Sequence, residues 1–326
     1  VSAEETSGFF SRMLDSPALM ILFAGIVIVL CIGICALGLQ NGIEKITKVM
    51  MMLLIVLMLV LVVNSLRLKG AGEGLKYFLV PSFSRLKENG YGSVAFAAMT
   101  HAFFTLSVGI GAMEIFGSYL KKGRRITGEA INVVILDTFV AVMAGLIIIP
   151  ACFAYGVQPD AGPSLLFITL PNVFQHMVGG RIWGCCFFVF MSFAALSTVI
   201  AVFENIISFW IDMFGISRKK SVLINTIIIL IASLPCVFGF NIWSGFQIFG
   251  QNVLGMEDFL VSNILLPVGS LVYLLFCVTK FGWGFDNYLD ECNTGKGIKF
   301  SKALKPYFKY VLPVLVLILI VQGFIK

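Results

Sequence analysis

Eight long apolar stretches divide this chain and constrain its fold more than any other feature. The composition agrees with them, since 59% of the 326 residues are hydrophobic, 12% are charged and the mean hydropathy is +0.99. Each stretch approaches or exceeds the roughly 20 residues that a helix needs to cross the hydrocarbon core of a bilayer, and none alternates as barrel strands do. The stretches are Ala18–Leu39, Ile43–Val63, Ser93–Tyr119, Ile131–Tyr155, Ile182–Ile211, Ser221–Phe240, Phe259–Thr279 and Tyr310–Ile325. The sequence therefore predicts an all-α integral membrane protein, with residues 1–326 forming one transmembrane domain.

The charges are distributed as in a multi-pass membrane protein. If the loop after Leu39 is cytoplasmic, the inside loops hold 15 of the 23 Lys and Arg residues, which is the positive-inside bias. These charges are scattered between spans rather than gathered on one folded face, so they do not predict nucleic-acid binding. The same orientation puts both ends of the chain outside, and the chain opens at Val1 without a signal peptide. We therefore expect a fragment of a longer protein with an odd number of further spans upstream.

The stretch Thr100–Tyr119 contains residues that favour an interruption of its helix. Its middle holds Thr105, Ser107, Gly109 and Gly111. Lipid cannot satisfy free backbone N–H and C=O groups, so an open helix at membrane depth needs protein, water, an ion or a substrate against it. Interrupted membrane helices form the binding sites of many secondary transporters, and this segment therefore predicts a binding site.

Polar side chains inside the other spans are candidate ion ligands. A carboxylate such as Asp137 within a span costs roughly 2.5–3.5 kcal/mol on insertion scales, so it either contacts interfacial water or faces a cation, a proton or a cavity. Ser192, Ser197 and Thr198 offer hard oxygen ligands for a small cation. They equally suit hydrogen bonds to the preceding helical turn. Glu114 and Glu204 are either structural or protonatable, and the eight Cys and two His residues show no metal-binding spacing.

Four segments together resemble the neurotransmitter:sodium symporter family, specifically its bacterial amino-acid transporter branch. Phe103–Ala112 resembles the unwound sixth helix of that family and Asp137–Gly145 resembles its seventh helix. Phe167–Phe174 resembles the outer gate loop, and Ala194–Thr198 resembles the eighth helix. The resemblance covers nearly the whole chain as helices four to eleven. It implies a partial inverted-repeat, leucine-transporter-like helix bundle that lacks the first three helices.

The resemblance also implies two sodium sites and a substrate pocket. Thr105 and Asp137 match the first sodium site, and the carbonyl of Ala194 with the hydroxyls of Ser197 and Thr198 matches the second. Each site would be completed by residues that this fragment lacks. The substrate pocket matches Phe104, Ser107, Gly109, Ile110, Thr198 and Val202.

Chloride-dependent members of the family resemble this chain but carry an amide at the position of Asp137 and a hydroxyl at the position of Ala141. The fixed carboxylate of Asp137 supplies the negative charge that chloride otherwise lends, so we expect chloride independence.

These features predict sodium-coupled symport of a neutral, hydrophobic amino acid by alternating access in a bacterial plasma membrane. Sodium, the amino acid and the lipid bilayer are the expected partners, and no feature predicts an enzyme. Two alternatives remain open: a proton-coupled or sodium-independent exchanger of the same fold, and a membrane receptor that binds an amino acid without moving it. We further expect residues 156–180 to dip back as a short helical hairpin over an outer vestibule.

Overall fold

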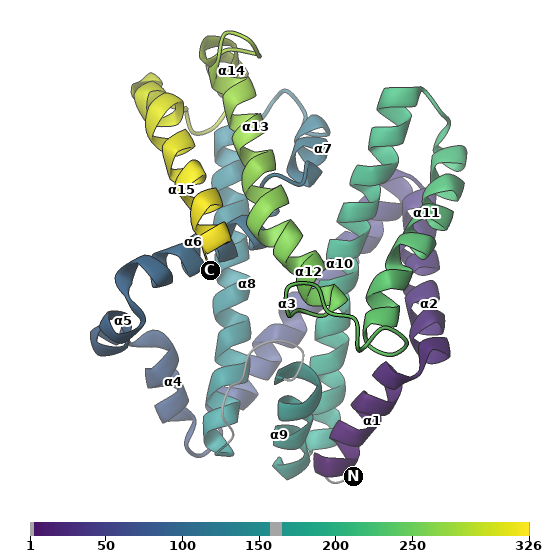
Figure 1. Cartoon of the computed structure of the whole chain (residues 1–326). Helices are drawn as coiled ribbons and strands as arrows, with labels where there is room; N and C mark the ends of the chain where they lie inside the picture. Colours follow the sequence, from purple (N-terminus) through teal and green to yellow (C-terminus); the bar gives the residue numbers. More distant parts are fainter. Residues whose placement is uncertain (1–2, 157–164, 326) are drawn as a thin grey trace. The chain divides into compact units, whose positions relative to one another are not determined.

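The computed structural model describes residues 3–156 and 165–325, which are helical and contain no β-strand (Figure 1). Seven segments of the described residues are long and apolar enough to cross a membrane. They are Pro17–Ala36, Gly42–Leu66, Ile126–Ala154, Gly180–Phe214, Arg218–Gly239, Val253–Val278 and Lys302–Gly323. The eighth predicted stretch, Ser93–Tyr119, is broken into two shorter helices, in line with the predicted interruption.

The spans correspond to named helices as follows. The first five continuous spans contain α2 (Pro17–Ala36), α3 (Lys45–Leu66), α8 (Ile126–Ala154), α10 (Gly180–Phe214) and α11 (Arg218–Gly239). The last two contain α12 (Val253–Phe259) with α13 (Leu266–Val278), and α15 (Leu312–Ile325). The remaining helices are α1 (Ala3–Asp15), α4 (Ala71–Leu79), α5 (Phe83–Asn89), α6 (Tyr91–Thr105), α7 (Ala112–Ser118), α9 (Leu170–His176) and α14 (Phe285–Asn293).

Local sequence signals explain several helix ends. Ser16 caps the start of α2 by accepting a hydrogen bond from the N–H of Leu19, and Pro17 occupies the first turn, where its missing N–H costs nothing. Gly215 ends α10 in a left-handed conformation, with φ of 63°. Pro81 separates α4 from α5, as expected for a residue that cannot continue a helix.

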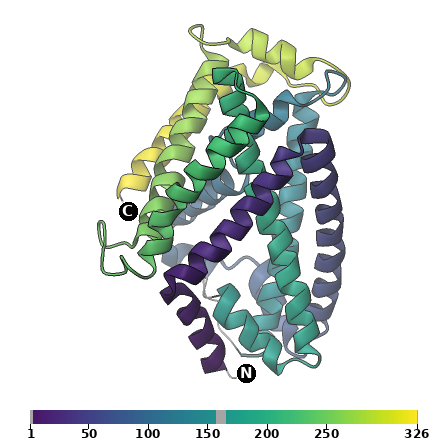
Figure 2. The same ribbon diagram turned by 90° about the vertical axis from the view of Figure 1, so that its right-hand side faces the viewer.

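The chain forms two compact units, residues 1–81 with 140–253 and residues 82–139 with 254–326. In the first unit, α10 packs against α2, α3 and α11, and α2 lies beside α11 (Figures 1 and 2). One buried cluster lies around Met58 of α3 and Phe187 of α10, and a second joins Ile32 of α2 to Ile207 of α10. Both clusters contain residues of α10, so α10 is the central helix of its unit.

In the second unit, α13 packs against α6, α14 and α15. The polypeptide enters α13 through a widened π-helical turn, Leu260–Leu265, and enters α15 through another, Tyr307–Val311. Such widened turns are often found at functional sites. Here the first of them adjoins α6, the helix that ends at the predicted interruption.

The predicted hairpin over an outer vestibule lies partly outside the described residues. Its described part contains a π-helical turn at Leu165–Thr169, followed directly by α9. Leu170 and Val173 of α9 are fully buried in the first unit, so this apolar loop segment packs as a helix.

Candidate functional site

The interruption between α6 and α7 covers residues 106–111. Ser107, Gly109 and Gly111 have φ values of 51°, 91° and 90°, in the left-handed region that no helix continues through. Such a conformation costs roughly 1–3 kcal/mol at a non-glycine residue like Ser107 and is typical of functional sites. The predicted interruption of the helix is therefore confirmed.

A close contact between backbones supports this interruption. A methyl group on Gly109 would lie 2.8 Å from the backbone nitrogen of Ser270 and would overlap the carbonyl oxygen of Leu266. A methyl group on Gly269 would in turn overlap the carbonyl oxygen of Gly109. The unwound segment thus lies directly against α13, and only glycine at both positions permits this approach.

Thr105 and Asp137 lie together at the end of α6. The Thr105 hydroxyl donates to the Asp137 carboxylate, with 3.0 Å to Oδ1 and 3.2 Å to Oδ2. Asp137 is partly buried in α8, and among the described residues no Lys, Arg or His forms an ion pair with it. A carboxylate and a hydroxyl without a basic partner are hard oxygen ligands that suit an alkali or alkaline-earth cation.

Three further oxygens gather on α10. The hydroxyls of Ser197 and Thr198 both donate to the carbonyl oxygen of Ala194, at 2.8 and 3.2 Å. Ser192 bonds separately to the carbonyl of Phe188. The bonds to Ala194 are the backbone hydrogen bonds expected of hydroxyls in apolar helices, and they also place three hard oxygens side by side.

The predicted substrate residues divide between the two units. Phe104, Ser107, Gly109 and Ile110 belong to the second unit at the helix interruption, whereas Thr198 and Val202 lie on α10 in the first unit. Phe104 is 53% exposed, and Ile110 and Val202 are partly buried. The pocket that these six residues would form together stays a prediction.

Two features of the structure were not expected from the sequence. Glu204 is fully buried and pairs with Arg218, whose guanidinium also donates to the carbonyl oxygen of Cys35. The sequence signal was available, because a buried acid in a span calls for a partner, but Arg218 was assigned only to the basic inside loop. The second feature is the close contact of Gly269 with Gly109. In the sequence, Gly269 looks like an ordinary small residue at a helix–helix contact.

Comparisons with known proteins agree with this arrangement. A model of the sodium:neurotransmitter symporter family matches residues 16–326. An uncharacterized sodium-dependent transporter of Bacillus subtilis, YhdH, is 34% identical over 86% of this chain and 61% of its own length. An uncharacterized sodium-dependent transporter of Haemophilus influenzae is 30% identical over 95% of this chain and 66% of its own length. The chain thus spans less than two thirds of either relative.

A solved structure gives the same result for the fold. The crystal structure of MhsT in complex with L-phenylalanine superposes with a TM-score of 0.85 and 34% sequence identity, covering 98% of this chain and 71% of MhsT. The fold and the family are those of transporters and not of enzymes. This chain, a multi-pass membrane protein, belongs to the sodium:neurotransmitter symporter family.

Proposed function

We propose that this chain carries ion and substrate ligands of a sodium-coupled symporter for a neutral, hydrophobic amino acid. One observation carries the proposal: the Thr105 hydroxyl and the Asp137 carboxylate meet at the end of the helix that unwinds over residues 106–111. A cation held there would neutralise Asp137 and would lie next to the interrupted segment of the chain. Family membership and the sodium-dependent relatives support sodium as this cation.

A second sodium ion is proposed at Ala194, Ser197 and Thr198. Their three oxygens already share one place on α10, so an ion would replace two hydrogen bonds within the helix by direct coordination. The two ion sites lie in different compact units of the chain. Ion binding that favours one arrangement of these units would shift their equilibrium, which is the thermodynamic basis of alternating access.

The substrate side of the proposal rests on residue chemistry and one comparison. Ile110 and Val202 are apolar, and neither offers a charge to a charged side chain of a substrate. MhsT, with the same fold, was crystallised with L-phenylalanine. A neutral, hydrophobic amino acid therefore fits this chain better than a charged one.

Chloride independence is the sharpest part of the proposal. Asp137 supplies a permanent negative charge, and Ala141, one helical turn further along α8, offers no hydroxyl to hold an anion. Curated mammalian relatives named sodium- and chloride-dependent GABA transporter 2 are more distant, at 26% identity over 63% of this chain for the mouse protein.

Uptake of labelled L-phenylalanine by proteoliposomes that contain the whole gene product tests the proposal. We expect uptake to require sodium and to be unchanged when gluconate replaces chloride. The Asp137→Asn/Ala141→Ser double variant should become chloride-dependent, while Ala141→Ser alone should not. Loss of wild-type uptake in gluconate would contradict chloride independence and leave sodium coupling intact.

Counterflow separates transport from binding alone. Liposomes loaded with unlabelled substrate should accumulate labelled substrate from outside in sodium buffer if the protein moves it across the bilayer. Sodium-dependent binding without counterflow would instead favour the receptor alternative. Uptake driven by a proton gradient in the absence of sodium would favour the exchanger alternative.

A further inference from the structure

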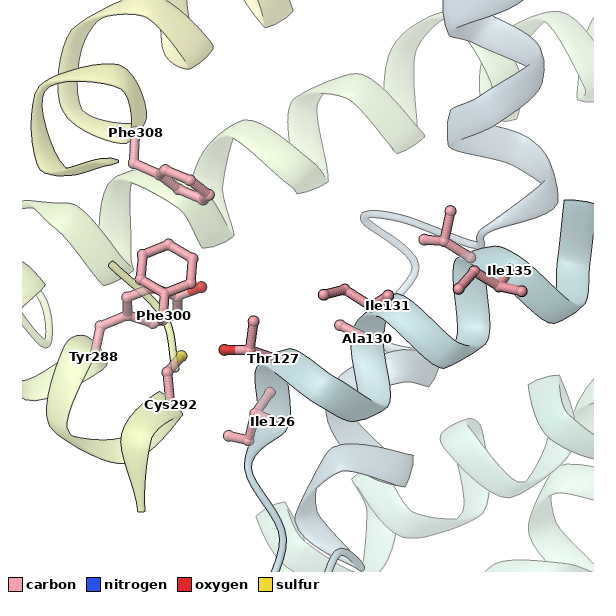
Figure 3. Close-up of a pocket in the computed structure, with 10 residues that line it drawn as sticks. Ile126, Thr127, Ala130, Ile131, Ile135, Tyr288, Cys292, Phe300 and Phe308 are labelled. Atoms are coloured by element: carbon pink, nitrogen blue, oxygen red, sulfur yellow. The ribbon is translucent and has the colours of Figure 1, made fainter. Parts of the chain in front are cut away.

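An apolar cavity of about 360 Å³ lies in the second unit. Figure 3 shows the first turns of α8 on one side, facing aromatic side chains on the other. The α8 wall consists of Ile126, Thr127, Ala130, Ile131, Val134 and Ile135. The opposite wall consists of Tyr288, Cys292, Phe300 and Phe308. A volume of this size is typical of small-molecule pockets.

The cavity follows the first turns of α8. Its α8 wall begins at Ile126, the first residue of the helix, and reaches Ile135. Nine residues of helix rise by roughly 14 Å, close to half of the roughly 30 Å hydrocarbon thickness. The cavity is therefore long enough along α8 for part of one acyl chain, and most of its lining is apolar.

Three polar groups lie among the lining residues: the Tyr288 phenol, the Cys292 thiol and the Thr127 hydroxyl. Burial raises the pKa of the Tyr288 phenol, so this group stays neutral. The Thr127 hydroxyl oxygen is buried and has no hydrogen-bond partner among the described residues. An acyl chain with an ester oxygen near its head would offer this hydroxyl an acceptor, whereas a plain hydrocarbon would not.

Basic residues adjoin the cavity lining in the sequence, and we take these segments as the mouth of the cavity. Arg124 and Arg125 directly precede Ile126, Lys299 precedes Phe300, and Lys309 follows Phe308. Residues 121–129 and 280–309 together hold ten Lys or Arg residues against four acidic ones. The positive-inside bias assigns both segments to the cytoplasmic face.

Some of these cations are already engaged, and others are not. Arg124 pairs with Glu129, Lys305 pairs with Asp286, and Arg125 donates to the carbonyl oxygens of Asn293 and Gly297. Two exposed lysines, Lys296 and Lys299, form no ion pair with any described residue. They are free to bind an anionic group from outside the chain.

The two loops at the mouth are fixed to each other. The backbone N–H of Arg125 donates to the carbonyl of Lys296, and the N–H of Lys296 donates to the carbonyl of Gly123. The Asn293 amide bonds to both the N–H and the carbonyl of Phe300. This network preforms the basic mouth, so little ordering would be needed when a ligand binds.

We infer that this cavity binds an anionic phospholipid of the cytoplasmic leaflet, with one acyl chain along α8 and the phosphate group at Lys296 and Lys299. The inference is independent of the transported substrate. It combines an apolar cavity beside the first turns of α8 with two exposed lysines that form no ion pair with any described residue.

Photolabelling of the full chain in lipid nanodiscs tests the inference. The bilayer is phosphatidylcholine with a minor fraction of a photoreactive probe lipid. The probe is either phosphatidylglycerol or phosphatidylcholine, each with the same photoreactive acyl chain. Labelled peptides are identified by mass spectrometry. We expect the phosphatidylglycerol probe to label residues 126–135 about tenfold more than its neutral counterpart. Each lysine near the membrane surface increases the affinity for anionic lipid, and the increases from Lys296 and Lys299 multiply. The Lys296→Gln/Lys299→Gln variant should lose this preference.

A second apolar groove serves as the internal control. It lies between α2 and α11, has a volume of about 260 Å³ and is lined by residues that include Ile21, Ala24 and Leu234. No Lys or Arg lies within five positions of these residues in the sequence, so both probes should label this groove equally. Val134→Trp, which fills the cavity, should remove labelling of residues 126–135 by either probe.

Two results would overturn the inference. Equal labelling of residues 126–135 by both probes would show an ordinary lipid-facing surface without selectivity for anionic lipid. Absence of labelling there, with normal labelling of the α2–α11 groove, would show that protein covers the cavity, either a second copy or another segment. The lysine variant carries the test if Val134→Trp fails to fold, because both lysines are exposed.

Discussion

A single fully buried carboxylate, Glu204, holds three helices of the first unit together. Glu204 lies on α10 and pairs with Arg218 at the start of α11. The Arg218 guanidinium also donates to the carbonyl oxygen of Cys35 in the last turn of α2. Removing one partner of a buried pair leaves an uncompensated charge, which typically destabilises by about 3–5 kcal/mol. We therefore expect Glu204→Ala to lower the thermal unfolding midpoint in detergent strongly, whereas Glu88→Ala, at an exposed position on α5, should leave it unchanged.

The double variant Glu204→Ala/Arg218→Ala separates pairing from packing. If the ion pair matters, the double variant should lose much less stability than the two single losses combined, because neither charge remains unpaired. Simple addition of the two losses would assign the effect to the cavity left by truncation.

The hydroxyls of Ser197 and Thr198 allow a matched test of the second proposed ion site. Replacing both by Ala removes two oxygen ligands, each comparable to a hydrogen bond to a charged group at about 1.5–3 kcal/mol. The sodium concentration for half-maximal uptake should rise, while membrane insertion stays normal. Ser192→Ala is the control, because this hydroxyl donates to the carbonyl oxygen of Phe188 and not to that of Ala194. Unchanged sodium dependence in the double variant would leave both hydroxyls as helix-packing groups.

Residue type predicted some of these contacts and not others. A carboxylate in an apolar span demands a counterpart, and a family resemblance identified Thr105 as the neighbour of Asp137, which the structure places within hydrogen-bond distance. The same demand applied to Glu204, yet Arg218 is fourteen positions away and looks like part of a cytoplasmic loop. Only the fold of α10 against α11 shows that a long guanidinium side chain reaches back into the membrane span.

At the scale of elements, the interruption after α6 was predictable because Gly109 and Gly111 tolerate the left-handed backbone that it needs. Its support from α13 was not, because a lone Gly in an apolar helix has several uses. Gly269→Ala tests this support. The added methyl group would overlap the carbonyl oxygen of Gly109, and overpacking of this kind costs roughly 1–3 kcal/mol.

We expect Gly269→Ala to weaken sodium and substrate affinity more than it lowers thermal stability, because the methyl group displaces the unwound segment in particular. Gly25→Ala in α2 is the matched control, since a methyl group there meets no described atom within 4 Å. Normal sodium affinity in Gly269→Ala would show that the unwound segment can shift without consequence for the ion site.

At the scale of the whole molecule, the all-α membrane fold followed from the eight apolar stretches, because hydrocarbon leaves the backbone few other ways to satisfy its polar groups. The division into two compact units did not. Its boundary runs through the middle of α8, between Phe139 and Val140, where composition and periodicity do not change. Long-range packing decides which half of a continuous helix belongs to which unit, and no local sequence signal records it.

This division makes the size of the substrate pocket a test of the whole arrangement, since Ile110 and Val202 belong to different units. If both line one pocket, Ile110→Phe and Val202→Phe should each penalise bulky substrates most and alanine least. A clash of methylene size in an apolar pocket is worth about 1–3 kcal/mol of discrimination. The measurement is competition of labelled substrate by unlabelled amino acids of graded side-chain volume. A change of rank order in only one variant would place only that residue at the substrate, and no change in either would return both to the protein core.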